Sequence, residues 1–572
     1  MNNNNKHKQP YGMQTRLSEE IDSMKYRQAG EDFYSKVIRI AEALKDTPEH
    51  FEEFKDALRM MRFMPAGRVQ NAMGAARQTT AYNCFVSGII EDSMESIMEK
   101  ATEAAFTMKK GGGIGYDFSR LRPRGDLIVS LDSRSSGAVS FMGIFDSVCQ
   151  TIASSGHRRG AQMGIMRIDH PDIEQFITAK NNSDKLTGFN ISIGVTDEFM
   201  NCLMQKKPFE LKFEGKVYRL VDPIALWDMV MRSTWDWAEP GVVFIDTINN
   251  YNNLYYCETI EATNPCGEQP LPPYGACLLG SFNLAKYVDI ETKTFDWEQY
   301  DQDIAVVVRA MDNTIDRTIY PLPQQEVEAK NKRRMGLGIT GLANAAEMLG
   351  HKYASDDFME FAEHALTTLR NETYSTSADL AEEKCSFPLY DWEKYSEGKF
   401  FKTLPQWLQD KIIAKGIRNS HLTSIAPTGT ISLTADNVSS GIEPPYSLFY
   451  DRTISLFDGN QVERVEDYAY RQGVAGRTAN EISAQDHVRV LALASKYVDS
   501  AVSKTCNVGD NVSYKDFKTL YVDAWLMGCK GITTFRAAGK RYGILNEAKN
   551  DNETEGAQAC FIDPDTGSKT CD

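Results

Sequence analysis

The chain has 572 residues, of which 42% are hydrophobic and 25% are charged, the composition of a folded globular protein with a sizeable core. Its formal net charge of −16 argues against nucleic acid or an anionic membrane surface as the main partner. Single nucleotides remain possible, because backbone N–H groups and a few basic side chains can hold a phosphate. No segment approaches the roughly 20 apolar residues of a membrane span, and residues 1–9 lack the apolar core of a secretory signal.

The N-terminal part has the periodicity of amphipathic helices. From about Leu17 to Met64, apolar residues recur every three or four positions, as in Phe33, Val37 and Ile40. We therefore expect residues 1–64 to form an arm followed by a short helical segment.

From residue 65 onward, short apolar runs alternate with Gly-rich turns and amphipathic stretches. The runs 84–90, 189–195 and 242–245 have the length and composition of buried strands, so the pattern predicts an α/β fold over residues 65–545. Residues 546–572 are polar and are expected to form a mobile tail. That tail nevertheless contains two thiols, Cys560 and Cys571.

The cysteine content predicts a reducing, cytoplasmic environment. There are 11 cysteines, an odd number in a large chain without an export signal, and no two of them form a CxxC pair. None of the 8 histidines lies in a compact metal-binding motif. The sequence therefore indicates no protein-bound metal site.

The loop Asn264-Pro265-Cys266-Gly267-Glu268 combines an amide, a thiol and a carboxylate within five residues. Prolines at 265, 270, 272 and 273 fix an irregular backbone there. Taken alone, the cysteine could be a small buried apolar group in a stiff turn. A second thiol, Cys277, follows 11 residues later and favours a functional site, because a carboxylate can act as general base and thiols can supply hydrogen atoms or electrons.

A turn of sequence Pro427-Thr428-Gly429-Thr430 follows the apolar Ile425 and leads into an expected helix start. Backbone N–H groups and hydroxyls presented together can cradle a phosphate. On local grounds an N-capped helix after a tight turn explains the pattern equally well.

Two glycine-rich stretches allow more than one interpretation. Residues 111–115 permit close approach of a ligand to the backbone, but a flexible turn explains them at least as simply. Residues 336–341 match the dinucleotide fingerprint G-x-G-x-x-G, yet they follow the polar stretch 331–335 and not a buried strand, which argues against a nicotinamide site.

Taken together, these motifs resemble ribonucleotide reductases, specifically the adenosylcobalamin-dependent class II, over about residues 65–536. The most specific match is Asn-Pro-Cys-Gly-Glu-Gln-Pro-Leu followed by Cys277. The other matching stretches are 82–84, 111–115, 158–161, 334–338, 426–432, 503–505 and 528–533.

The resemblance implies a ten-stranded α/β barrel with the radical cysteine on a finger loop inside it. Cys266 would be that cysteine, Glu268 the base for the 3′ hydroxyl and Asn264 a group that orients the sugar. Cys84 and Cys277 would supply two electrons by closing to a disulfide, and Cys560 and Cys571 would reopen it. A flexible tail reaches about 25 Å, enough for that exchange. Ten residues separate Cys560 from Cys571, whereas the cysteine pairs common in class II tails lie close together.

The resemblance also assigns substrate, effector and partner sites. Substrate contacts would come from Met64, Asn83, Ser119, Pro265, Gly267, Pro427, Thr428, Gly429, Thr430 and Ile431. A dNTP or ATP specificity effector would contact Asp92, Ser93 and Lys185, with loops 120–137 and 180–188. The expected partners are a ribonucleotide, a thioredoxin- or glutaredoxin-like reductant, and a second copy in a homodimer through a helix over about 139–154.

About 60 residues precede the expected barrel, fewer than the roughly hundred of the ATP-cone in many members, so that switch is not expected.

Three alternatives remain open at this point. A class I catalytic subunit would receive its radical from a separate protein, usually through a tyrosine pair near the C-terminus. Tyr521 and Tyr542 are 21 residues apart and form no such pair in the sequence. A non-catalytic nucleotide-binding regulator would use the cysteines structurally, and a nicotinamide oxidoreductase would use residues 336–341. Neither the phosphate level of the substrate nor the oligomeric state can be read from the sequence.

Overall fold

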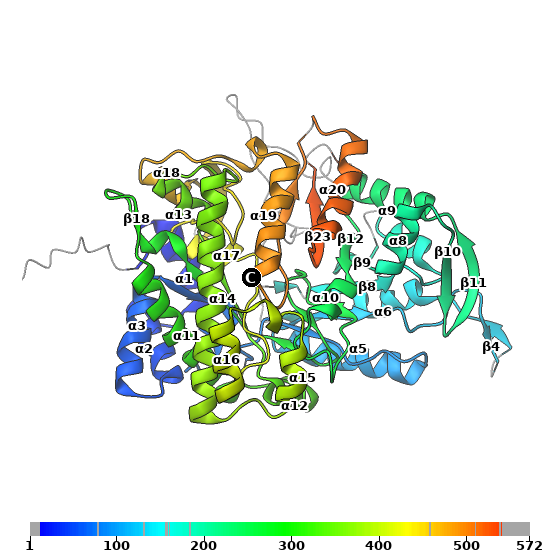
Figure 1. Ribbon diagram of the computed structural model, residues 1–572, viewed down its shortest axis with the longest axis horizontal. Helices are drawn as coiled ribbons and strands as arrows, with labels where there is room; N and C mark the ends of the chain where they lie inside the picture. Colours follow the sequence, from blue (N-terminus) through cyan, green and yellow to red (C-terminus); the bar gives the residue numbers. More distant parts are fainter. Residues whose placement is uncertain are drawn as a thin grey trace, which may run out of the picture.

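The computed structural model is a mixed α/β protein in which helices surround one large and one small sheet (Figure 1). It describes residues 12–76, 79–129, 132–154, 158–159, 161–181, 185–456, 459–509, 511–536 and 539. No helix within these ranges is both long enough and apolar enough to span a bilayer.

The large sheet has eight strands in the order β15-β2-β3-β8-β9-β12-β23-β22. Its central five strands are parallel, whereas β15 pairs antiparallel with β2 at one side and β23 pairs antiparallel with β12 at the other. Most residues of the central strands are buried, as expected when a parallel sheet is covered on both faces. The strands are β2 (Cys84–Val86), β3 (Gly113–Asp117), β8 (Gln162–Arg167), β9 (Phe189–Val195), β12 (Gly241–Phe244), β15 (Ala276–Cys277), β22 (Thr505–Asn507) and β23 (Gly531–Phe535).

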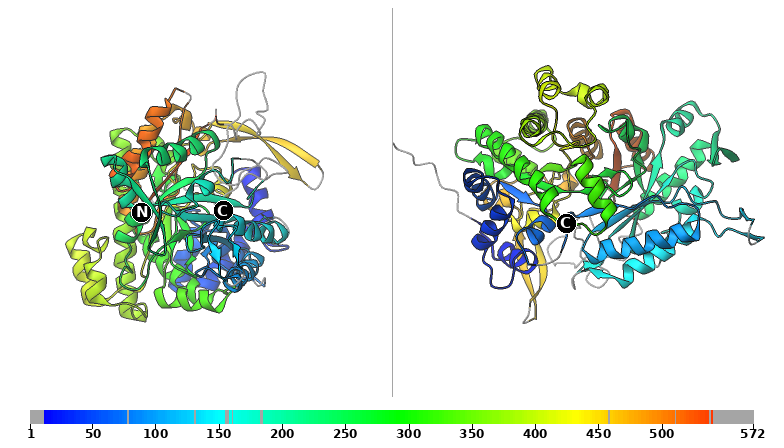
Figure 2. Two further views of the ribbon diagram at one scale, coloured as in Figure 1. Left: turned by 90° about the vertical axis from the view of Figure 1, so that its right-hand side faces the viewer. Right: turned by 90° about the horizontal axis from the view of Figure 1, so that it is seen from below.

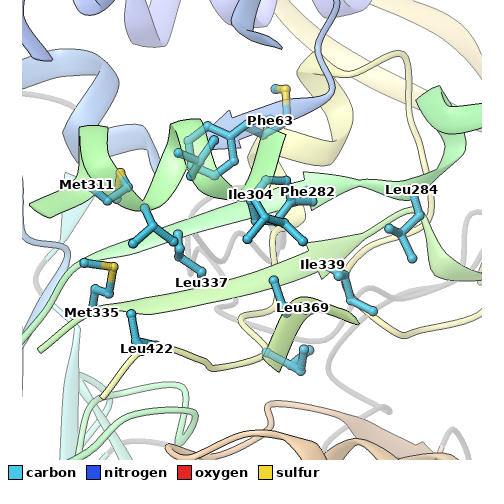
Figure 3. Close-up of a cluster of buried hydrophobic side chains, with 14 of the residues drawn as sticks. Phe63, Phe282, Leu284, Ile304, Met311, Met335, Leu337, Ile339, Leu369 and Leu422 are labelled. Carbon is cyan, nitrogen blue, oxygen red and sulfur yellow. The ribbon is translucent and has the colours of Figure 1, made fainter. Parts of the chain in front are cut away.

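The small sheet has the order β1-β16-β19, and its central strand continues the chain directly after β15. Its apolar side chains pack with helix α11 in a large hydrophobic cluster (Figure 3). Single β-bridges extend this sheet, from Leu337 to Thr423 and from Ile425 to Val502. The strands are β1 (Phe63–Pro65), β16 (Leu279–Asn283) and β19 (Gly336–Thr340).

Three N-terminal helices confirm the predicted helical periodicity: α1 (Arg16–Tyr26), α2 (Phe33–Leu44) and α3 (Pro48–Arg59). Each begins at an Asp or Thr side chain that accepts a backbone N–H of the first turn, which satisfies one of the otherwise unpaired donors there. Residues of α2 and α3 belong to the same hydrophobic cluster as the small sheet. The prediction of helix up to Met64 was wrong in one respect, because Met64 lies in strand β1 opposite Ser281.

The predicted runs at 189–195 and 242–245 correspond to strands β9 and β12, whereas the run at 84–90 forms a strand, β2, only over 84–86. In Figure 1, helices α14 and α19 lie between the N-terminal helices and strands β8, β9 and β12. The remaining helices are α4 (Gly67–Ala72), α5 (Met94–Lys109), α6 (Ala138–Thr151), α7 (Ile173–Ile177), α8 (Asp197–Gln205), α9 (Pro223–Trp237), α10 (Ile245–Asn250), α11 (Trp297–Arg317), α12 (Pro323–Lys332), α13 (Leu342–Leu349), α14 (Asp356–Lys384), α15 (Trp392–Glu397), α16 (Gln406–Lys415), α17 (Gly429–Thr434), α18 (Tyr468–Arg471), α19 (Ala484–Tyr497) and α20 (Tyr514–Leu526).

Antiparallel hairpins decorate the body, and one of them, β20–β21, projects away from it (Figure 2). Another, β13–β14, carries the candidate site. The hairpin strands are β4 (Leu127–Ile128), β5 (Ser133–Arg134), β6 (Ala153–Ser154), β7 (Arg158–Arg159), β10 (Phe209–Phe213), β11 (Lys216–Val221), β13 (Ala262–Thr263), β14 (Pro270–Leu271), β17 (Val288–Asp289), β18 (Thr294–Phe295), β20 (Phe449–Leu456) and β21 (Gly459–Glu466).

Candidate active site

The Asn-Pro-Cys-Gly-Glu motif forms the tip of the β13–β14 hairpin, which we call the finger loop (residues 264–269). The Asn264 backbone N–H donates to the Gln269 carbonyl at 3.0 Å, and that of Gly267 donates to the Asn264 carbonyl at 3.1 Å. Gly267 has a φ of 83°, a conformation that favours glycine. The stiff turn expected from the prolines is therefore a short closed loop.

Glycines of both sheets make room for the finger loop. A Cβ atom on Gly115 of β3 would lie 1.8 Å from the Thr263 carbonyl oxygen, and one on Gly336 of β19 would lie 2.1 Å from Gln269 Nε2. This close approach explains Gly113 and Gly115 of the stretch 111–115, since a Cβ atom on Gly113 would lie 3.0 Å from Pro265 Cγ. Gly336 and Gly338 lie inside strand β19, and only Gly341 lies at the turn into α13. The three glycines together therefore do not form the strand-to-helix loop of a dinucleotide site.

Inside the finger loop, Asn264 holds Glu268 in place. Asn264 Nδ2 donates to Glu268 Oε1 at 2.8 Å, and Asn264 Oδ1 accepts the backbone N–H groups of Gly267 and Gln269. Glu268 Oε2 is buried and has no hydrogen-bond partner among the described residues. Burial raises the pKa of Glu268 to about 7, although the hydrogen bond from Asn264 acts in the opposite direction. A carboxyl group with this pKa can take up or release a proton near neutral pH.

The sheet register brings the two other candidate thiols together, because Cys84 of β2 lies directly opposite Cys277 of β15. Such residues have Cα atoms about 4.5–5.5 Å apart, within the roughly 4.4–6.8 Å seen in disulfides. Both thiols are buried and neither is in a disulfide. Burial raises the pKa of Cys277 well above its ordinary value, and Cys84, Glu268 and Cys266 contribute to the rise. The structure therefore gathers three thiols and one carboxylate.

The turn at 427–430 leads into helix α17, as predicted. Thr428 has a φ of 56° and its hydroxyl is already occupied inside the protein, because it lies 2.9 Å from Thr340 Oγ1 and accepts the Gly441 backbone N–H at 2.7 Å. The buried Thr430 hydroxyl has no hydrogen-bond partner within the described ranges. Sequence reasoning missed Thr340 and Gly441, since their link to the turn depends on contacts between distant segments.

The other expected substrate residues lie in or beside strands of the two sheets. Met64 is buried in β1. Asn83 directly precedes Cys84, and its buried Oδ1 has no hydrogen-bond partner in the described part of the chain. Ser119 follows β3, where its hydroxyl accepts the Arg167 backbone N–H at 2.8 Å and contacts Asp117 Oδ1. Sequence reasoning also missed Asn190, whose Nδ2 donates a hydrogen bond to the Pro265 carbonyl at 3.0 Å.

The structure joins one of the three predicted effector residues, Asp92, to the expected loop. Asp92 forms an ion pair of 2.5 Å with Arg122, and Ser93 caps helix α5. Lys185 is exposed and has no hydrogen bond or ion pair with Asp92 or Ser93 in the described ranges. The predicted interface helix is α6, which ends at Thr151 and not at Ser154.

Two predicted site residues, Cys560 and Cys571, lie outside the described residues.

Comparison with known proteins identifies the family of this thiol-and-carboxylate site. The family described as "Ribonucleotide reductase, barrel domain" matches residues 82–472 and 460–535, so the chain belongs to the ribonucleotide reductases. It is 35% identical over 528 residues to a vitamin B12-dependent ribonucleoside-diphosphate reductase of Mycobacterium tuberculosis (strain CDC 1551 / Oshkosh), covering 87% of this chain and 73% of that protein. A similarly named protein of Thermoplasma acidophilum is 34% identical over 547 residues, covering 88% and 68%. These similarities place the chain in class II of the family.

Proposed function

We propose that the chain reduces ribonucleoside diphosphates to deoxyribonucleotides by thiyl-radical chemistry with adenosylcobalamin as cofactor, as the names of its relatives suggest. The observation that carries this proposal is the convergence of the Cys84–Cys277 pair with the finger loop that bears Cys266, Asn264 and Glu268. A dithiol in disulfide range beside a third thiol and a carboxylate is the set of groups that this reduction needs.

The tip of the finger loop is accessible to a cofactor and a substrate. Cys266 is only half-buried, and a Cβ atom on Gly267 would meet nothing within 4 Å. Bound near this tip, adenosylcobalamin would supply the organic radical that converts the Cys266 thiol into a thiyl. The residues that would face it are Cys266 and Gly267.

The side chains of the site then divide the reduction between them. The Cys266 thiyl takes the hydrogen atom from the ribose 3′ carbon, and Glu268 Oε2, the unpaired oxygen, accepts the 3′ hydroxyl proton. The 2′ hydroxyl leaves as water, with two electrons and two protons coming from Cys84 and Cys277 as they close to a disulfide. Cys266 finally returns its hydrogen atom to the 3′ carbon, and Glu268 returns the proton to the 3′ oxygen. Burial of the site keeps water from quenching the radical.

The substrate phosphates would bind at the turn before α17. Backbone N–H groups at the start of a helix favour anions, and the unpaired Thr430 hydroxyl is available as an additional donor. In this proposal Pro427, Gly429 and Ile431 contribute backbone, whereas Thr428 holds the shape of the turn. Met64, Asn83 and Ser119 would contact the nucleoside.

We further propose that the two sheets close into a ten-stranded barrel around the finger loop. The bridges Leu337–Thr423 and Ile425–Val502 support this closure, because they connect β19 to the segment that leads into β22. One parallel half of the barrel would consist of β16, β19, residues 423–425, residues 502–507 and β23. The other half would consist of β2, β3, β8, β9 and β12. The barrel would occupy residues 65–545, after the N-terminal segment and before a redox tail at 546–572.

Regeneration and regulation complete the proposal. Cys560 and Cys571 of the tail would reduce the Cys84–Cys277 disulfide and be reduced in turn by a thioredoxin- or glutaredoxin-like protein. A dNTP or ATP effector would bind near Asp92, Ser93 and Lys185. Met94, Met98 and Phe106 are each about half exposed along one side of α5, which packs on α6, and this apolar stripe supports a homodimer through these helices.

One assay tests the central proposal. Purified chain, a dithiol and adenosylcobalamin are incubated in the dark with a nucleoside diphosphate or triphosphate, and the deoxynucleotide is quantified. We expect turnover with the diphosphate and none without the cofactor. Turnover only after addition of a separate radical-generating subunit would instead support a class I enzyme.

A further inference from the structure

One cation lies beside the proposed reducing pair without an acidic partner. Arg68 of helix α4 is half-buried, and its guanidinium lies against Gly111, where a Cβ atom would come within 2.4 Å of the Arg68 Cζ. The described part of the chain gives Arg68 neither an ion pair nor a hydrogen bond. Most of the other buried or half-buried guanidinium groups have such partners, as Arg62 has in Asp303 and Arg333 in Asp312.

Arg68 lies next to the strand that pairs with the thiol-bearing β2. Gly111, which it contacts, lies two residues before Gly113, and Gly113 of β3 is the register partner of Cys84. Burial lowers the pKa of Arg68, whereas the nearby Cys84 and Tyr26 act to raise it. Opposite charges stabilise each other equally. A Cys84 thiolate that stabilises the charge on Arg68 is therefore itself stabilised by that charge.

The two sulfurs of the pair therefore have different surroundings. Cys277 is 1% exposed and Cys84 is 7% exposed. Cys277 has Glu268 and Cys266 of the finger loop as neighbours, and both disfavour a second negative charge. Cys84 has the guanidinium of Arg68 on its side of the pair.

We propose that Arg68 is a positioning residue that makes Cys84, and not Cys277, the thiolate-forming member of the reducing pair. The ionisation breaks the S–H bond of Cys84, transfers the proton to water or buffer and leaves the charge on sulfur opposite the guanidinium. This inference rests on the proposed function for its biological role, but the ionisation itself requires neither cofactor nor substrate. Cys84 would then be the sulfur that reacts first with thiol-directed reagents.

The test measures thiol reactivity in the reduced full-length protein. Alkylation by iodoacetamide is followed from pH 6 to 10 by mass spectrometry of the Cys84 and Cys277 peptides. We expect Cys84 to react faster than Cys277 at neutral pH. The change Arg68→Gln should move the Cys84 midpoint upward and slow its alkylation at neutral pH by about tenfold, which corresponds to one pH unit. Arg68→Lys should keep most of the rate, because it keeps the charge.

Arg489→Gln serves as the matched control, because Arg489 is an exposed arginine of α19 paired with Asp486, and it should leave both rates unchanged. If Arg68→Gln loses its cooperative thermal transition, Arg68→Met replaces it, since methionine keeps the apolar stem without the charge. Equal Cys84 rates in the wild type and the folded neutral variant would overturn the inference. So would a neutral variant that binds nucleoside diphosphate more weakly at an unchanged Cys84 rate, because Arg68 would then be a phosphate ligand.

The outcome is separable from that of the proposed function. A failed dark assay with a normal Arg68 effect on alkylation would refute the reductase activity and leave the charge effect intact. An active enzyme without the alkylation effect would refute the role of Arg68 alone.

Discussion

The finger loop and the turn before α17 are both buried polar loops, but they treat their polar groups differently. In the finger loop, Glu268 Oε2 and the whole side-chain amide of Gln269 have no hydrogen-bond partner among the described residues. At the turn, the Thr428 hydroxyl is held by Thr340, Ser432 and Gly441. Unpaired buried groups cost stability. The contrast supports a reactive role for the finger loop, whereas the turn holds its shape through Thr428 and leaves the Thr430 hydroxyl without a hydrogen-bond partner among the described residues.

The change that would separate the two loops most strongly is Cys266→Ser. We expect reduction to fall below detection, because a hydroxyl cannot form the radical that a thiol forms under the same conditions. Nucleotide binding, measured by equilibrium dialysis, should be retained, since the phosphate turn is untouched. Residual turnover in this variant would contradict the role of Cys266, and loss of binding would mean that the two loops are not independent.

The next largest effect is expected for Glu268→Gln. The amide keeps the size of the side chain but cannot accept a proton, so the rate should fall by about 10²–10⁴-fold. In the wild type, kcat/KM should fall as the pH drops through about 7, because the raised pKa leaves Glu268 protonated below that value. The pH–rate profile checks this, and a profile of the variant that keeps the same acidic limb would assign the limb to another group.

Gly115→Ala tests the space that the finger loop requires. Its Cβ would lie 1.8 Å from the Thr263 carbonyl oxygen, so the β13–β14 hairpin must shift and activity should fall at least about tenfold, as expected when reacting groups are misplaced by about 1 Å. Gly194→Ala is the control in strand β9 of the same sheet, because its Cβ would have only an ordinary contact at 3.6 Å. If both variants have equal activity and melting temperature, the close packing of the finger loop is not needed.

The smallest effect is expected for Thr428→Val, which affects the turn only. Loss of the shared hydroxyl should lower the free energy of unfolding by about 1–3 kcal/mol, because the partners remain buried. We also expect a higher KM with little change in kcat. Thr428→Ser keeps the hydroxyl and should stay close to wild type in denaturant melts. A drop in kcat without a change in KM would mean that the turn takes part in the reaction step.

The sequence allowed accurate prediction where the signal is local. The helices of the N-terminal segment, the strands at 189–195 and 242–245, and the helix start after Thr428 all follow from periodicity or turn residues. The family was recognised from short motifs and is confirmed by the comparisons. The roles of individual residues, the tail cysteines and the domain boundaries stay predictions.

What could not be predicted depends on contacts between distant segments. The pairing of Cys84 with Cys277 was expected only from the family resemblance, because it depends on the register between strands almost 200 positions apart, which periodicity does not specify. The glycines of 111–115 and 336–341 allowed two interpretations in the sequence. In the structure, Gly113, Gly115 and Gly336 are needed because residues 263–269 pack against them. Arg68 belonged to no motif that we singled out, because its significance comes from the absence of a partner.

The register of Cys84 and Cys277 has one further consequence. Since the two residues already face each other across a pair of hydrogen-bonded strands, the proposed disulfide could form and break without rearrangement of the strands. The oxidised and the reduced form of the pair would then share one backbone conformation. A reductant would then have to contact the sulfur atoms themselves, because no loop or helix would change position between the two forms.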